Sequence, residues 1–208
     1  IAAALASVPG MLAGPISKAI FPRFTGLVEV GDKISLVALY HKTSAFVAVA
    51  IIPGTLTLLV FSTDFIYAWT GDMYAASSAG PVASFLLAGA IFQSLTITPF
   101  YIALAHGNVK INLQIGVASL VLLVPLLIYF IPKYGVLGAG IAWLSMNMCT
   151  GIPYVLMLHK RFLSGEFFRW FSRGIIFPVS IVIPIVLLGR LYFPLTEARF
   201  VTLVNIGL

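Results

Sequence analysis

Residues 131–148, "IPKYGVLGAGIAWLSMNM", join two apolar runs through a very short break. Pro132 ends one helix and Gly135 lets the chain reverse, so the stretch predicts a tight turn between antiparallel helices. Small residues follow at once, and Gly138 and Ala142 lie four apart on one helix face. Helices in a membrane associate by close van der Waals approach, so this face predicts packing against a neighbouring helix directly after the turn. The alternative to fixed packing is an interface at which the two helices can slide or separate.

The amino-acid composition indicates whether the chain folds in water or in a lipid bilayer. Of the 208 residues, 61% are hydrophobic and 9% are charged, and the mean hydropathy is +1.09. Soluble domains are about 45–50% apolar and about 25% charged. This chain therefore has too little polar surface to cover a globule in water, and a lipid bilayer is the natural environment. The single cysteine, Cys149, lies in an apolar run and predicts a small packed residue.

The predicted fold is all-α: a polytopic helical bundle with about six complete transmembrane helices and the start of a seventh. A spanning helix needs about 20 mostly apolar residues. The apolar segments do not alternate as barrel strands do, which excludes a transmembrane barrel. The predicted spans are 1–22, 43–69, 78–104, 111–131, 136–158 and 174–193, with 200–208 beginning another. Because both ends lie inside apolar runs, we expect a fragment of a longer protein.

Loop charges predict how the helices are oriented. Alternate loops collect nine of the twelve Lys and Arg residues on one side, starting with a predicted loop at 18–42. By the positive-inside rule this side faces the cytoplasm, which predicts a multi-pass membrane protein. The net charge of +6 is then a topology signal and gives no reason to expect nucleic acid as a partner.

The chain divides into three predicted parts. Residues 1–158 form a five-helix transmembrane block, and residues 159–173, "HKRFLSGEFFRWFSR", form a basic and aromatic cytoplasmic linker. Residues 174–208 hold a further transmembrane helix and the start of the next. Prolines recur within the apolar runs, and membrane helices tolerate such kinks where neighbours or a wet cavity satisfy the freed carbonyls.

Three stretches carry a resemblance to a known family: "GPISKAIFPRFTGLVEVGDKISLVALYHKTSAF" (14–46), "IIPGTLTLLVFSTDFIYAWTG" (51–71) and "ALAHGNVKINLQIGVASLVLLVPLLIYFIPKYGVLGAGIAWLSMN" (103–147). By the order of these three stretches, the chain resembles the second lobe of polysaccharide flippases of the multidrug/oligosaccharidyl-lipid/polysaccharide exporter superfamily. The resemblance is to bacterial O-antigen and capsule repeat-unit flippases in particular.

The resemblance implies a non-enzymatic function in surface polysaccharide and lipopolysaccharide synthesis. That function is translocation of an undecaprenyl-pyrophosphate-linked oligosaccharide by alternating access between two lobes. The implied partners are this lipid-linked substrate and membrane lipids, together with a polysaccharide polymerase and chain-length proteins. No cofactor is implied.

Polar residues within the predicted spans are the candidates for the substrate path, because such residues usually face a bundle interior or a cavity. Amides suit sugar hydroxyls, since they both donate and accept hydrogen bonds. The candidates are Lys18, Gln93, Thr96, Asn112, Gln114 and Asn147. Hydrogen bonding between helices is the alternative for the uncharged ones. Lys18 either faces the pyrophosphate or extends to the headgroups.

The remaining basic residues at the predicted cytoplasmic ends are assigned to topology or lipid headgroup contact: Arg23, Lys42, Lys110, Lys160, Arg161, Arg169 and Arg173. His41, His106 and His159 fall at predicted helix ends without metal-ligand spacing, so we expect no metal site. All six acids lie in predicted loops or at helix ends, which leaves no intramembrane carboxylate for ion coupling.

Two alternatives stay open. A membrane-embedded polysaccharide polymerase or transferase needs a cluster of catalytic His, Asp, Glu or Arg residues, and no catalytic residue is predicted here. A drug or cation exporter of the same superfamily would more often carry carboxylates within its helices.

Overall fold

The computed structural model describes residues 1–192, and nearly all of them are helical. In chain order the helices are α1 (Ala2–Val30), α2 (Lys33–Val60), α3 (Ser62–Thr70), α4 (Met73–Leu95), α5 (Ile97–Ala105), α6 (Val109–Tyr134), α7 (Val136–Phe162), α8 (Phe167–Phe171), the π-helical turn η1 (Ser172–Ile176) and α9 (Phe177–Tyr192). The predicted start of a seventh span at 200–208 lies outside the described residues, as do Glu197 and Arg199.

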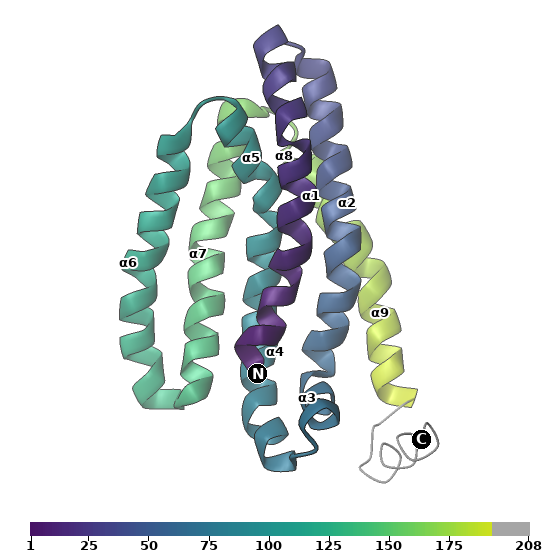
Figure 1. The fold of residues 1–208 in the computed structure, drawn as a ribbon, viewed down its shortest axis with the longest axis vertical. Helices are drawn as coiled ribbons and strands as arrows, with labels where there is room; N and C mark the ends of the chain where they lie inside the picture. Colours follow the sequence, from purple (N-terminus) through teal and green to yellow (C-terminus); the bar gives the residue numbers. More distant parts are fainter. Residues whose placement is uncertain (193–208) are drawn as a thin grey trace.

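The predicted fold class is confirmed. Six segments of the described chain are long and apolar enough to cross a membrane, and they run up and down as a bundle (Figure 1). The turns between α1 and α2, α5 and α6, and α7 and α8 lie at one end, here called the basic end. The turns between α3 and α4 and between α6 and α7 lie at the other, the opposite end (Figure 1).

The predicted loop at 18–42 is wrong. Helices α1 and α2 continue through it and leave only Gly31 and Asp32 between them, so a helical hairpin projects beyond the rest of the basic end (Figure 1). Gly31 ends α1 in the left-handed region at φ 75°, and the Asp32 carboxylate caps α2 by accepting the Ser35 backbone N–H at 3.0 Å. This bond lowers the pKa of Asp32. Charged residues indicate where a helix leaves the membrane. They do not indicate where the helix ends, because a helix can continue beyond the membrane.

Other boundaries also differ from the prediction. The span predicted at 43–69 is interrupted at Phe61, where α2 ends and the short α3 begins. The last described span begins at Phe167 instead of 174, because α8, η1 and α9 form one continuous 26-residue helix. Residues 159–173 therefore contain the end of α7, a short turn and the start of that helix. The division of the chain into a block, a linker and a trailing part stays a prediction.

The turn quoted at the outset forms at Gly135 as expected, but Pro132 does not end the helix, because α6 continues through it to Tyr134. Gly135 connects α6 to α7 with φ 59°, a backbone conformation that favours glycine. A Cβ at Gly138 would overlap the Phe130 carbonyl of α6, and one at Gly140 would lie 2.9 Å from Phe85 Cβ of α4. The small residues thus bring the start of α7 against two helices at once, and this confirms the predicted close packing.

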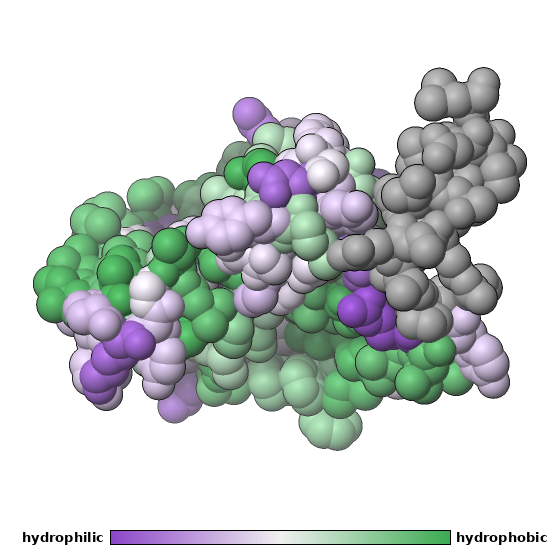
Figure 2. Space-filling view, turned by 90° about the horizontal axis from the view of Figure 1, so that it is seen from below, coloured by the Kyte–Doolittle hydropathy of each residue, from purple (hydrophilic) through white to green (hydrophobic). Residues whose placement is uncertain are grey.

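Burial is uneven across the bundle. The main core joins residues of α1, α2, α4, α5, α7 and α8, among them Phe24, Ile52, Leu95, Ile102 and Leu158, and α6 contributes only Ile111 to its buried part. In the most apolar stretch of α2, 39% of the residues are buried, whereas in that of α6 none are. Viewed from the opposite end, hydrophobic residues cover most of the flanks (Figure 2). Helix α6 therefore projects from the core, connected by the turn to α7, and this leaves a groove behind it.

Candidate functional site

The largest hollow among those found in the described part of the chain is a groove of about 690 Å³ bounded by α6 on one side and by α7, α5 and the end of α4 on the other. Gly10 of α1 completes its wall. The groove lies along the middle of α6 and α7 and extends toward the basic end, well away from the packed turn at Gly135. Its lining mixes apolar side chains with the amides and hydroxyls of four helices, α4, α5, α6 and α7.

One hydrogen-bonded bridge crosses the groove from α7 to α6. The Tyr154 hydroxyl donates to Asn112 Oδ1 at 2.7 Å, and Asn112 Nδ2 donates to the Phe100 carbonyl of α5 at 3.2 Å. Tyr154 is buried, while Asn112 stays partly exposed. This chain of bonds joins three helices at the basic side of the groove and holds the Asn112 amide in a fixed orientation.

The other polar groups in the wall bond mainly to their own helix. Asn147 Nδ2 donates to the Trp143 carbonyl at 2.9 Å, and the Thr150 hydroxyl donates to the Met146 carbonyl at 2.8 Å. The Thr96 hydroxyl donates to the Gln93 carbonyl at 2.7 Å. A hydroxyl that donates locally keeps its lone pairs as acceptors, so these groups can still bind hydroxyls of a ligand.

Trp143 forms an apolar part of the same wall because Gly89 makes room for it. A Cβ at Gly89 would lie 2.6 Å from Trp143 Cδ1, so only glycine allows α4 and the indole ring to approach this closely. The buried Trp143 Nε1 has no hydrogen-bond partner among the described residues. An unpaired donor is costly in an apolar setting, and this one faces Gly89 of α4, 2.9 Å from where a Cβ would lie.

The structure brings together four of the six predicted path residues. Gln93, Thr96, Asn112 and Asn147 all line the groove. Lys18 is exposed on α1 and is not part of the groove wall. Gln114 lies in a separate hollow at the basic end with Lys110 and Arg161. The helical period of residues 93–100 indicated the first pair, but only the packing of α6 against α7 brings Asn112 and Asn147 to the same groove.

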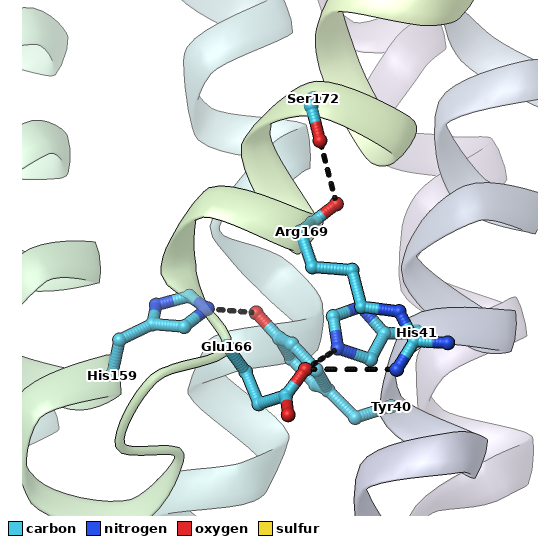
Figure 3. A network of polar contacts seen from close by, with 6 residues as sticks. All are labelled: Tyr40, His41, His159, Glu166, Arg169 and Ser172. Atoms are coloured by element: carbon cyan, nitrogen blue, oxygen red, sulfur yellow. Dashed lines mark hydrogen bonds and ion pairs between the residues drawn. The ribbon is translucent and has the colours of Figure 1, made fainter.

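A second polar cluster at the basic end was missed by the sequence analysis (Figure 3). His41 Nε2 lies 2.6 Å from the Glu166 carboxylate, and Arg169 Nη1 lies 3.9 Å from the same oxygen. His159 is buried at 2% exposure, and its Nε2 lies 3.2 Å from the Tyr40 hydroxyl. The predicted placement of His41 at a helix end is wrong, because it is the ninth residue of the 28-residue α2.

The bonds of His159 define its protonation. Nδ1 lies 2.8 Å from the Val155 carbonyl, which has no proton to offer, so Nδ1–H donates and Nε2 accepts from Tyr40. The cluster thereby connects α2 to α7 through Tyr40 and to α8 through His41 (Figure 3). No sequence spacing relates residues 40 and 159, so only an alignment or a structure could have paired them.

Chemically, the groove walls offer amides, hydroxyls and apolar side chains. Among residues 1–192 no three His, Cys, Asp or Glu side chains approach closely enough to hold a metal ion. The five described acids lie at helix ends: Glu29, Asp32, Asp64, Asp72 and Glu166. The groove can form hydrogen bonds and apolar contacts with a ligand along its length.

Fold and groove together define a multi-pass helical membrane protein with a polar groove between its helices. The chain is similar to a protein of Shigella flexneri named "Putative O-antigen transporter", with 30% identity over 155 residues that cover 74% of this chain. The chain spans about 36% of the length of that relative. No protein-family model matches the chain, and no solved structure matches it. The similarity confirms the resemblance to O-antigen transporters that the sequence motifs indicated.

Proposed function

We propose that this chain forms part of a transporter that moves lipid-linked oligosaccharide repeat units across the bacterial inner membrane for surface polysaccharide synthesis. The observation that carries the proposal is the groove between α6, α7 and α5, whose amides and hydroxyls reach deep into an otherwise apolar bundle. Polar side chains at that depth are costly in lipid and usually line a substrate path.

The chemistry of the wall fits a carbohydrate. Sugars present hydroxyls around the rim of a ring whose C–H faces are apolar, so they bind sites that combine amides with an aromatic plane. Gln93, Asn112 and Asn147 supply the amides, and Trp143 and Tyr101 supply the rings. The proposed route of the oligosaccharide is therefore along this groove.

Alternating access is the proposed mechanism, with the groove facing a second lobe in the complete protein. Thr96, Asn147 and Thr150 bond to carbonyls three or four residues earlier in the chain, so a shift of the helices would not leave these three side chains unpaired. The absence of clustered carboxylates in the membrane-spanning part of residues 1–192 favours this reading over a drug or cation exporter. An ion that couples transport to a gradient would then bind elsewhere in the complete protein.

A matched pair of glutamines tests the groove. We expect Gln93→Leu to lower surface polysaccharide about tenfold in a strain lacking the native gene, because one hydrogen bond to the moving sugar is lost. Gln114→Leu removes the same amide outside the groove and is expected to retain wild-type transport. The measurement is the amount of polysaccharide at the cell surface, with lipid-linked repeat units counted in the inner leaflet.

Two results would contradict the proposal. Equal activity of the Gln93→Leu and wild-type proteins would exclude this groove as the path. Normal export of repeat units from a strain lacking the gene and any second exporter would exclude the transport function altogether.

A further inference from the structure

A second hollow at the basic end differs in character from the groove. It has a volume of about 300 Å³ and lies between α2 and the α8–η1 segment. Its lining includes three cationic side chains, Lys42 from α2, Arg169 from α8 and Arg173 from η1. Ligand-sized hollows begin at about this volume, which suits one headgroup better than an oligosaccharide.

The charges around this hollow leave a positive excess. Glu166 is the one carboxylate in the neighbouring network, and it is already engaged by His41 at 2.6 Å and approached by Arg169 at 3.9 Å (Figure 3). Neither Lys42 nor Arg173 forms an ion pair among the described residues. Two exposed cations, Lys42 and Arg173, therefore border an otherwise apolar hollow without a protein anion to neutralise them.

Backbone geometry keeps the hollow open. Residues 172–176 form a π-helical turn, a rare widening of the helix that is frequent at functional sites. Gly174 of this turn lines the hollow, and a Cβ there would meet nothing closer than Trp170 Cδ1 at 3.9 Å. Packing alone does not require a glycine at 174, and a larger side chain would intrude on the hollow.

Apolar side chains continue from the two free cations toward the membrane interior. Phe46 lies four residues beyond Lys42 on α2, and Phe177 lies four residues beyond Arg173 on the α8–α9 helix. Both rings are strongly exposed, at 60% and 64%. Each helix thus presents a cation at the level of the basic end and an apolar ring one turn deeper, which matches a lipid with a charged head and apolar chains.

We propose that Lys42, Arg169 and Arg173 form a binding site for the phosphodiester headgroup of an anionic phospholipid of the same leaflet. Basic hollows between helices at the positively charged side of membrane proteins bind such headgroups. The site is separate from the groove, and it does not depend on which substrate the groove carries. A bound lipid would hold α8 and η1 against α2.

Native mass spectrometry of the complete protein in detergent tests the site with three probes: phosphatidylglycerol, phosphatidylethanolamine and inorganic phosphate. We expect the double variant Lys42→Gln/Arg173→Gln to lose phosphatidylglycerol binding about fivefold for each cation removed. The matched control is Arg23→Gln/Lys160→Gln, which removes two positive charges from the same end outside the hollow and is expected to retain the lipid.

Gly174→Leu tests the hollow without altering charge, and we expect it to release the lipid as the double variant does. Thermal unfolding of each variant shows which proteins are folded, and if the double variant fails to fold, Gly174→Leu and Lys42→Gln alone decide the question. Three outcomes would overturn the site: equal loss of lipid in the control, unchanged binding in Gly174→Leu, or equal affinity for phosphatidylethanolamine. Displacement of the lipid by inorganic phosphate would assign the hollow to a soluble anion.

Discussion

The hairpin of α6 and α7 behaves differently at its two ends. Next to the turn, Gly138 brings the backbones into contact, with no space for a Cβ beside the Phe130 carbonyl. Farther along, the same two helices separate enough to leave the groove, and a Cβ at Gly116 of α6 would meet nothing within 4 Å. Both regions contain glycine in an apolar helix, yet one glycine permits contact and the other preserves space. Whether a glycine permits helix contact or leaves open space therefore depends on how close the facing helix lies.

The largest expected effect comes from breaking the packed region. Gly138→Leu forces a side chain into the α6 backbone, and overpacking of this kind costs about 3 kcal/mol. The measurement is unfolding of the purified protein in detergent together with its abundance in membranes. We expect little folded protein to remain.

Gly116→Leu is the matched control on the facing helix. Its side chain enters the groove, so the free energy of unfolding should stay within about 0.5 kcal/mol of the wild-type value. Polysaccharide export should fall nonetheless, because the added side chain obstructs the proposed path. Equal stability of the two variants would mean that the contact at Gly138 does not hold the hairpin.

A smaller effect is expected from the bridge across the open region. A double-mutant cycle of Tyr154→Phe and Asn112→Ala should give a coupling energy of about 0.6 kcal/mol, the average for hydrogen bonds between membrane helices. The measurement is the free energy of unfolding of the wild type, both single variants and the double variant. Tyr129→Phe, on an exposed face of α6, is the control.

A coupling energy of zero in that cycle would show that the bridge does not hold α6 and α7 together. The groove walls would then be joined only through the packed turn. A coupling energy above the expected value would instead show that the bridge holds α6 and α7 together at the groove almost as firmly as the packing at Gly138 does near the turn.

The smallest effect concerns the α1–α2 turn, which projects beyond the bundle and depends on local chemistry alone. Hydrogen bonding to Ser35 lowers the pKa of Asp32, so the carboxylate stabilises the start of α2 above the ordinary pKa of an aspartate. That stabilisation is lost as the pH falls through the lowered pKa. Protection of the first amides of α2 against hydrogen exchange, corrected for the intrinsic rate, should decline over this acidic range.

Asp32→Asn separates capping from titration, because asparagine also caps helices but does not ionise. The variant should therefore retain protection at low pH. If the variant and the wild type lost protection together, the decline would come from another group.

Much of the fold was readable from the sequence. The membrane environment, the six spans and the tight turn at Gly135 were predicted correctly, since each depends on composition or local residue order. Boundaries were less predictable. Charged residues at 18–42 were interpreted as a loop, but a helix satisfies its own backbone hydrogen bonds and can continue into water without a break.

The candidate site was predicted only in part, and for a related reason. Gln93 and Thr96 lie close in sequence, so helical spacing places them on one face. Asn112 and Asn147 line the same groove only because the turn folds α7 back along α6. The pairing of Tyr40 with His159 joins residues 119 positions apart, and no local pattern encodes it.

The sequence by itself determined that this chain belongs in a bilayer, how many of its segments can cross one, and where α6 turns into α7. These features follow from transfer free energies and backbone preferences, which act residue by residue. Tertiary structure decided which amides line the groove, which cations surround the second hollow, and which glycine touches a neighbour. Those features depend on how far apart two helices lie, and that distance is set by all the side chains between them.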